Sequence, residues 1–232
     1  MRLDRDSVQK IKKIELTDPN YSYLMGFLQA DGSKYEDTRN RGRISVELSL
    51  RDSDLIYKLA DLIPCPSHIS FRSRTTNFTN GKIHDSITLK INWLEFRNRM
   101  TELGLPTGVK SHLVAPPAVP FIVRDYMRGL IDGDGSVGLT SKGLPFISLI
   151  TNSEFIKDFV VDQTEGFLGY RKISNRNQRD QVFNPMLNRE DAVIFATWLY
   201  QEGDLALDRK MDAARLVKDW IRPIEIKRRG TK

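Results

Sequence analysis

The sequence predicts an α+β protein made of two similar halves, and three observations lead to this prediction. A nine-residue stretch occurs twice, at 24–32 and 127–135, and ends each time in Asp-Gly. Segments with strand-like and helix-like spacing of apolar residues follow both copies in the same order. Matching features recur at nearly constant offsets, as expected of an internal repeat. These offsets are 103 residues between Asp31 and Asp134 (134 − 31), 100 between Ser53 and Ser153 (153 − 53), and 99 between Gly104 and Gly203 (203 − 104).

Composition describes an ordinary globular protein with a basic surface. Hydrophobic residues make up 40% and charged residues 28% of the 232 residues, and no apolar run approaches the ~20 residues that span a bilayer. The charged N-terminus has no apolar signal region, and Cys65 is the only cysteine, so we expect an intracellular protein without disulfides. A net charge of +6 favours a polyanionic partner such as a nucleic acid.

The first half is expected to begin with two helices. Apolar residues at helical spacing cover 8–16, and Asp18-Pro19-Asn20 ends that helix and caps the next, which carries the first motif copy. Alternating residues at 43–50 predict a strand with one solvent-exposed face. Asp52-Ser53-Asp54 then caps a helix that Pro64 ends.

A hairpin follows in the predicted order. Strands at 68–74 and 82–91 meet around Asn80-Gly81, which is a typical hairpin turn. Apolar side chains, Phe71 among them, are expected on the inner face and polar ones on the outer face. A helix at 93–103 completes the first half.

The second half repeats this order after a Pro-rich connector. Its predicted elements are a strand at 146–151, a helix capped by 152–154, a strand pair within 169–188 and a closing helix at 192–200. We therefore expect a first repeat at 1–105, a linker at 106–122, and a second repeat with a basic tail at 123–232.

Each motif copy places small residues four positions apart. These predicted interface residues are Gly26 and Ala30 in one copy and Gly129 and Gly133 in the other. Because positions i and i+4 share one helix face, two such helices would pack closely. Asp31 and Asp134 end the helices and would come together, although like charges repel. A divalent cation such as Mg²⁺ would remove that repulsion, and paired metals cleave phosphodiesters.

The two stretches, Leu24-Met-Gly-Phe-Leu-Gln-Ala-Asp-Gly32 and Met127-Arg-Gly-Leu-Ile-Asp-Gly-Asp-Gly135, closely resemble the signature of LAGLIDADG homing endonucleases. The order of predicted elements is also similar, so the resemblance covers nearly the whole chain. It implies a monomer of two pseudo-symmetric αββαββα-type repeats, with the motif helices packed at the interface and antiparallel DNA-binding sheets forming a saddle. It places the protein in a bacterial or phage-host cytoplasm, or in an organelle.

The same resemblance implies a reaction and its cofactor. Mg²⁺-dependent cleavage of both DNA strands across the minor groove would leave short 3′ overhangs. Mn²⁺ would substitute for Mg²⁺, and Ca²⁺ would bind without supporting cleavage. Carried over by position, Asp31 and Asp134 are the catalytic metal ligands, helped by the backbone carbonyls of Ala30 and Gly133. Basic residues that follow the last helix of each repeat would lie near the scissile phosphates, and two lysines hold those positions: Lys110 and Lys210.

The two motif copies differ from each other. Gln29 replaces the first acid of the signature, which Asp132 keeps. Arg128 occupies a position that is usually small, so we expect its side chain to face away from the partner helix. Such differences are consistent with an asymmetric DNA target.

Residues on the outer faces of the sheets would recognise the DNA bases, as in β-ribbon recognition of DNA. Arginine suits guanine, and asparagine or glutamine suits adenine. The candidates in the first half are Arg43, Ser45, Glu47, Arg72, Arg74, Thr88 and Lys90. Those in the second half are Arg171, Lys172, Ser174, Asn175, Arg176, Asn177, Gln178 and Arg179.

The sequence thus predicts a site-specific endonuclease that makes a metal-dependent double-strand break in a long asymmetric target, as in intron or intein mobility. Two alternatives stay open on the same fold: an intron maturase that binds RNA, and a DNA-binding regulator without catalysis. Retention of Asp31 and Asp134 favours the nuclease, because only a nuclease requires them. Double-stranded DNA is the expected partner, intron RNA the partner of a maturase, and a membrane is not expected.

Overall fold

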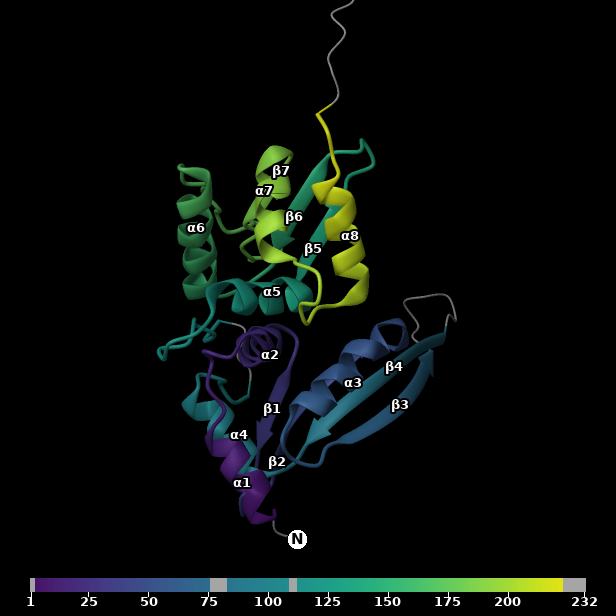
Figure 1. Cartoon of the computed structure of the whole chain (residues 1–232), viewed down its shortest axis with the longest axis vertical. Coiled ribbons are helices and arrows are strands. Elements are labelled where there is room, and N and C mark those ends of the chain that lie inside the picture. Colours follow the sequence, from purple (N-terminus) through teal and green to yellow (C-terminus); the bar gives the residue numbers. More distant parts are fainter. Residues whose placement is uncertain (1–2, 76–82, 109–111, 223–232) are drawn as a thin grey trace, which may run out of the picture.

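The computed structural model describes residues 3–75, 83–108 and 112–222, and it confirms the predicted α+β fold. The first half forms the lower part of Figure 1 and the second half the upper part. Helix α5 (Val123–Asp134) lies on α2 (Pro19–Ala30) where the halves meet (Figure 1). Each half has its own antiparallel sheet, with strand order β1-β2-β4-β3 in the first and β5-β6-β7 in the second.

The first half follows the predicted order, with one additional short strand. Its elements besides α2 are α1 (Arg5–Lys12), β1 (Ser33–Glu36), β2 (Gly42–Ser49), the 3-10 turn η1 (Leu50–Asp52), α3 (Ser53–Leu62), β3 (His68–Thr75), β4 (Ile83–Ile91) and α4 (Leu94–Glu102). β1 was not predicted because its Ser-Lys-Tyr-Glu sequence shows no apolar alternation. The expected turn at Asn80 and Gly81 lies outside the described residues.

Local signals place the first motif helix as predicted. The carboxylate of Asp18 accepts the N–H of Asn20 at 2.8 Å, and Pro19 is the first helical residue. In the sheet that follows, Ile44, Val46 and Leu48 of β2 are buried, which confirms the alternation.

One residue of the predicted inner face of that sheet, Phe71, is not buried. It pairs with the buried Ile87 and so lies on the inner side, yet 63% of it is exposed. The reason is position: β3 is the edge strand, whereas α3 packs on β2 and β4.

The second half departs from the prediction directly after its motif helix, where an additional strand was not predicted, and again from residue 169 on. Besides α5 it contains β5 (Gly135–Leu139), β6 (Pro145–Leu149), α6 (Glu154–Leu168), β7 (Met186–Asn188), α7 (Glu190–Leu199) and α8 (Asp208–Lys218). The strand pair predicted within 169–188 is wrong, because β7 is the only strand there. Ile173 is the only apolar residue from 171 to 181, and it is 83% exposed. A further strand would therefore have no apolar face to bury.

Helix α8 was not predicted either. Its buried positions, Met211, Ala214 and Val217, recur every three residues and cover the strand β5. Every helix in the described ranges is too short or too polar to cross a lipid bilayer.

Candidate active site

The two motif helices pack so closely that their backbones touch. A Cβ added at Gly26 would lie 2.2 Å from the carbonyl oxygen of Tyr126. A Cβ added at Gly129 would lie 2.2 Å from the carbonyl oxygen of Tyr23. Real Cβ atoms do not approach other atoms this closely, so both positions require glycine. The predicted interface glycines therefore form the crossing of α2 and α5.

The same crossing brings the chain around Asp31 and Asp134 together. A Cβ added at Gly133 would lie 2.4 Å from the Cβ of Ala30, and 3.3 and 3.5 Å from the backbone nitrogen and Cβ of Asp31. Asp31 caps the C-terminal end of α2, and Asp134 is the last residue of α5. Both residues are exposed to solvent. Two carboxylic acids thus stand at adjoining helix ends, open to a large ligand.

This arrangement suits a hard divalent cation. Both helix ends carry partial negative charge, and their last carbonyl groups lack partners within the helix. Among the described residues, no group of three or more His, Cys, Asp or Glu side chains is placed to hold a metal ion. A pair of carboxylates is nevertheless enough for Mg²⁺, which commonly takes one or two carboxylates, waters and phosphate oxygens of the substrate. The donors present fit Mg²⁺ bound together with a phosphodiester.

Lys210, expected beyond the last predicted helix of its repeat, lies inside the additional helix α8 and is 3% exposed. Burial lowers the pKa of its ammonium group to about 8, against the opposing effect of the Asp132 carboxylate. Its Nζ donates to three carbonyl oxygens at the end of α5: Ile131 at 2.6 Å, Asp132 at 2.7 Å and Gly135 at 2.8 Å. Lys110, its counterpart in the repeat, lies outside the described residues.

One tyrosine hydroxyl of each motif helix donates a hydrogen bond to the other motif helix. The Tyr23 hydroxyl donates to Oδ2 of Asp132 at 2.8 Å, and the Tyr126 hydroxyl donates to Oε1 of Gln29 at 2.5 Å. Neither tyrosine was predicted to belong to the site. Their offset of 103 residues (126 − 23) equals that of the two acids, and this match was the available signal.

Asp132 and Gln29 make different bonds beyond these tyrosines. Oδ1 of Asp132 accepts the Tyr200 hydroxyl at 2.7 Å, and its Oδ2 accepts the Leu207 N–H at 2.7 Å. Complete burial raises the pKa of Asp132, while these hydrogen bonds act in the opposite direction. The Gln29 amide instead donates to two carbonyl oxygens at the connector: Gly104 at 2.9 Å and Ala115 at 3.1 Å.

Asp132→Ala is expected to lower the free energy of unfolding by about 3 kcal/mol or more, because it leaves three buried donors without an acceptor. Asp132→Asn is the matched control. Its oxygen still accepts the Leu207 N–H, and the Tyr200 hydroxyl can turn to accept from the new NH₂ group. Urea unfolding measures both variants. Equal losses for alanine and asparagine would contradict this account.

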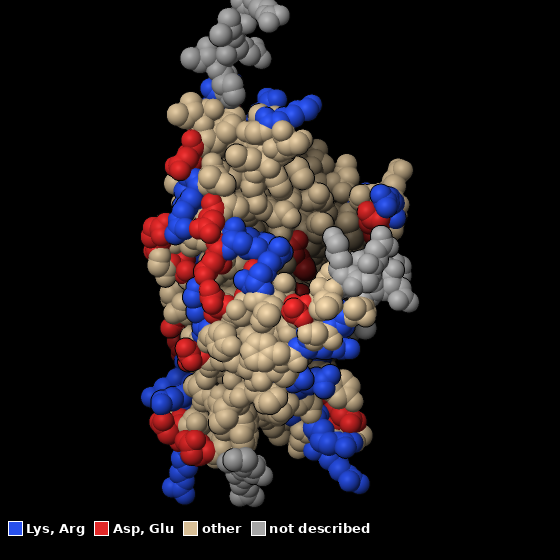
Figure 2. Space-filling view, turned by 90° about the vertical axis from the view of Figure 1, so that its right-hand side faces the viewer, with Lys and Arg blue, Asp and Glu red and all other residues tan. Residues whose placement is uncertain are grey.

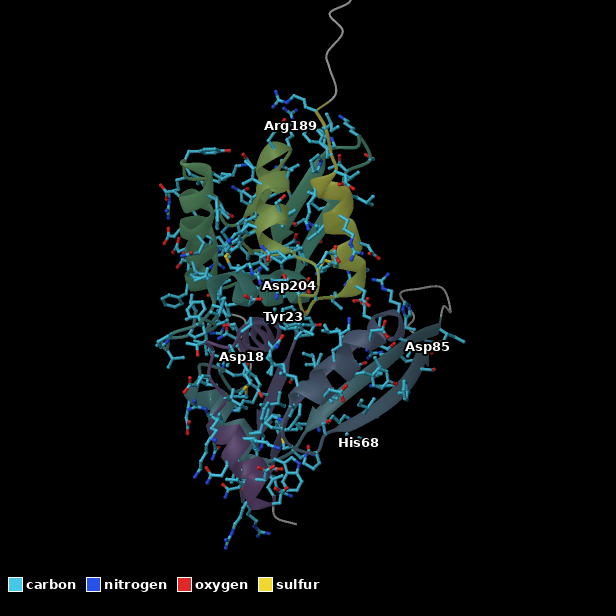
Figure 3. The ribbon with its side chains drawn as sticks, in the orientation of Figure 1. Asp18, Tyr23, His68, Asp85, Arg189 and Asp204 are labelled. Atoms are coloured by element: carbon cyan, nitrogen blue, oxygen red, sulfur yellow. The ribbon has the colours of Figure 1, made fainter. Side chains whose placement is uncertain are left out.

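Arg128 was expected to face away from the partner helix, and its guanidinium does bond to its own half, at the carbonyl oxygens of Leu205 (3.0 Å) and Leu199 (3.1 Å), but it also contacts the partner helix. Its guanidinium carbon lies 5.5 Å from the ring centroid of Tyr23, and the side chain is 1% exposed. The planar group can lie against an aromatic ring, so a small residue is unnecessary here. Arg128 also pairs with Asp125 and with Asp204, the latter at 3.0 Å. Figure 3 shows Tyr23 at the crossing and Asp204 just above it.

The seven DNA-binding candidates of the first half share one face of the four-stranded sheet. Direct cross-strand pairs place Ser45 beside Lys90, and Glu47 beside Thr88. Arg74 of β3 reaches Glu47 at 3.0 Å. Thr88 is 9% exposed, so it offers little surface to a ligand. This face carries the positive charge of Arg43, Arg72, Arg74 and Lys90 on three strands.

The eight candidates of the second half do not lie on a sheet face. They belong to the irregular segment between α6 and β7. Arg171 pairs with Asp162 and Glu165 of α6, and Lys172 pairs with Asp191 of α7. The others are Ser174, Asn175, Arg176, Asn177, Gln178 and Arg179, of which Arg176 lies over the ring of Phe183 at 4.5 Å.

No family model and no curated protein matches the chain. Among solved structures, it is similar to the homing endonuclease I-WcaI bound to its DNA recognition sequence, at a TM-score of 0.57 and 12% identity over 90% of this chain and 94% of that one. The I-LtrWI LAGLIDADG homing endonuclease bound to target DNA matches at 0.51 and 10% identity, over 87% and 91%. Full-length WhiA from Thermatoga maritima matches at 0.51 and 14% identity, over 97% and 69%. The chain therefore has the fold of the LAGLIDADG homing endonucleases.

Proposed function

We propose that the protein is a site-specific DNA endonuclease that makes a divalent-metal-dependent double-strand break. The observation that carries the proposal is the placement of Asp31 and Asp134 at adjoining, solvent-exposed ends of two packed helices. Two carboxylates held close together repel each other, which is costly unless a cation or a substrate-bound metal binds to them.

The chain's own residues would hold and orient the reacting groups. Asp31 and Asp134 would each bind metal through a carboxylate, with the carbonyls of Ala30 and Gly133 nearby at the helix ends. Bound Mg²⁺ supplies a water of lowered pKa and stabilises the leaving oxygen of the phosphodiester. Lys110 remains the candidate for a basic group beside the phosphates.

DNA is the partner that the surface favours. The exposed face of the first sheet carries several cations, and the chain has a net charge of +6. Figure 2 shows further Lys and Arg side chains gathered at mid-height, where the two halves meet. I-WcaI and I-LtrWI, which share the fold, are described bound to DNA. The two unequal halves suit a monomer acting on an asymmetric target.

Selection of cleaved sites from a randomised double-stranded DNA library tests the proposal. Specific cleavage is expected with Mg²⁺ or Mn²⁺, with both strands cut, and none with EDTA or with Ca²⁺ alone. Binding should persist in Ca²⁺. A protein that cuts no member of the library but binds structured RNA tightly would replace this proposal by the maturase alternative.

A further inference from the structure

The first turn of α8 contacts both halves of the protein beside the candidate active site. Asp208, Arg209 and Lys210 are consecutive, yet Arg209 reaches the first half whereas Lys210 reaches the second. The acceptors of Lys210 lie at the end of the motif helix α5, whereas the acceptor of Arg209 lies outside both motif helices. The role inferred for this turn rests on the proposed function, because it concerns the placement of the two acids.

Lys210 donates hydrogen bonds to backbone carbonyls on both sides of Asp134 in the sequence. Its acceptors are the carbonyls of residues 131, 132 and 135, so they bracket Asp134. An ammonium group has three N–H donors, and all three are used in these bonds. A lysine placed so at a helix C-terminus stabilises the last carbonyls and their partial negative charge. No donor of Lys210 remains for a DNA phosphate.

Arg209 joins the same turn to the first half. Its Nε lies 3.0 and 3.1 Å from the two carboxylate oxygens of Asp52. Asp52 is 9% exposed and ends η1, directly after β2. By the 100-residue offset of the repeat, Asp52 corresponds to Asn152 and Arg209 to Val109, which cannot form an ion pair. The Asp52–Arg209 ion pair therefore has no counterpart at the equivalent positions of the repeat.

We propose that Arg209 and Lys210 are positioning residues that hold the α5 end carrying Asp134 at a fixed place relative to the first half and Asp31. Lys210 fixes the backbone at Asp134. Arg209 ties that lysine's helix to Asp52. Neither residue touches the reacting phosphate in this assignment, which changes the role expected of Lys210 from a phosphate contact to a support of the metal-binding acid.

Substitutions of Lys210 separate the two roles. Lys210→Met is expected to slow cleavage by about ten- to a hundredfold, because a small misplacement of a reacting group has effects of this size. The DNA dissociation constant should change less than about twofold, and the slope of log K against log salt should not change. A lost phosphate contact would instead reduce that slope by about 0.9, and this result would overturn the proposal.

Lys210→Arg supplies a second criterion. A guanidinium keeps contact with a phosphate, but its planar fork does not fit three carbonyls that converge on one nitrogen. Arginine should therefore restore little of the cleavage rate. Full activity in Lys210→Arg together with a reduced salt slope in Lys210→Met would assign the lysine to DNA.

A double-mutant cycle tests Arg209. Asp52→Ala and Arg209→Ala are each expected to slow cleavage and lower the unfolding temperature, and the double variant should be little worse than either single one. The matched cycle uses Lys58 of α3 and Asp208, which join the first half to the same turn of α8 at 2.8 Å but are 46% and 59% exposed. Ion pairs so exposed contribute little, so Lys58→Ala should leave activity unchanged. Additive effects at Asp52 and Arg209, or a reduced salt slope in Arg209→Ala alone, would overturn the inference.

The unfolding cycle does not depend on cleavage. If the parent protein cuts no DNA, the proposed function fails, whereas coupling between Asp52 and Arg209 in thermal unfolding still decides whether α8 ties the halves together. Absence of that coupling refutes the inference whatever the activity.

Discussion

Asparagine in place of Asp31 or Asp134 is expected to reduce Mg²⁺-dependent cleavage by about a thousandfold or more. An amide carries no negative charge, and its NH₂ group cannot ligate a metal, so each change removes one of the two carboxylates at the helix ends. Metal ions contribute several kcal/mol to such reactions, and a loss of about 4 kcal/mol corresponds to a factor of a thousand. Single-turnover cleavage of the selected DNA site gives the rate constants.

DNA binding should survive both substitutions. A carboxylate beside a phosphate is repulsive in the absence of metal, so the affinity of either variant in EDTA should equal or exceed that of the parent. Asp61→Asn is the control, since Asp61 is an exposed acid of α3 outside the motif. Cleavage at the parental rate in both motif variants would remove these acids from the mechanism.

Gly129→Ala is expected to lower the free energy of unfolding by about 3 kcal/mol or more, the upper range for overpacking. The added Cβ would lie 2.2 Å from the carbonyl oxygen of Tyr23 and 2.7 Å from the backbone nitrogen of Phe27. Backbone atoms inside a helix cannot turn away as a flexible side chain can. The helices would have to separate, and the chain around Asp31 and Asp134 with them.

Gly166→Ala is the matched control for that loss. Gly166 also lies inside a helix, α6, but an added Cβ there meets no atom within 4 Å. Alanine at such an exposed helical position should stabilise the protein by up to about 1 kcal/mol. Urea denaturation of the two variants compares them directly. A loss below about 1 kcal/mol for Gly129→Ala would show that the crossing is looser than the structure has it.

The parts of the site that depend on local spacing could be predicted from the sequence. Small residues four apart and the following acids depend on one helix turn, so Gly26, Gly129, Asp31 and Asp134 were found without knowledge of the fold. The cap at Asp18 is local in the same way.

Contacts between distant residues could not be predicted. Lys210 is 75 residues beyond Gly135 (210 − 135), and no spacing rule links a lysine to carbonyls so far away. The helix α8 that carries Lys210 was not predicted either, so nothing indicated that this lysine is buried. The error at 171–181 has another cause: its polar residues resemble an exposed sheet face, but no apolar residues alternate with them to form a buried face.

The tyrosine hydrogen bonds between the two motif helices have a consequence for fragments that contain only one half of the chain. Tyr23 and Tyr126 each find their acceptor only in the opposite half, and each glycine groove is filled only by the opposite backbone. Half a chain, from proteolysis or an interrupted gene, would leave these groups unpaired and would carry one acid of the two. Under the proposed function, we therefore expect such a fragment to cleave neither DNA strand.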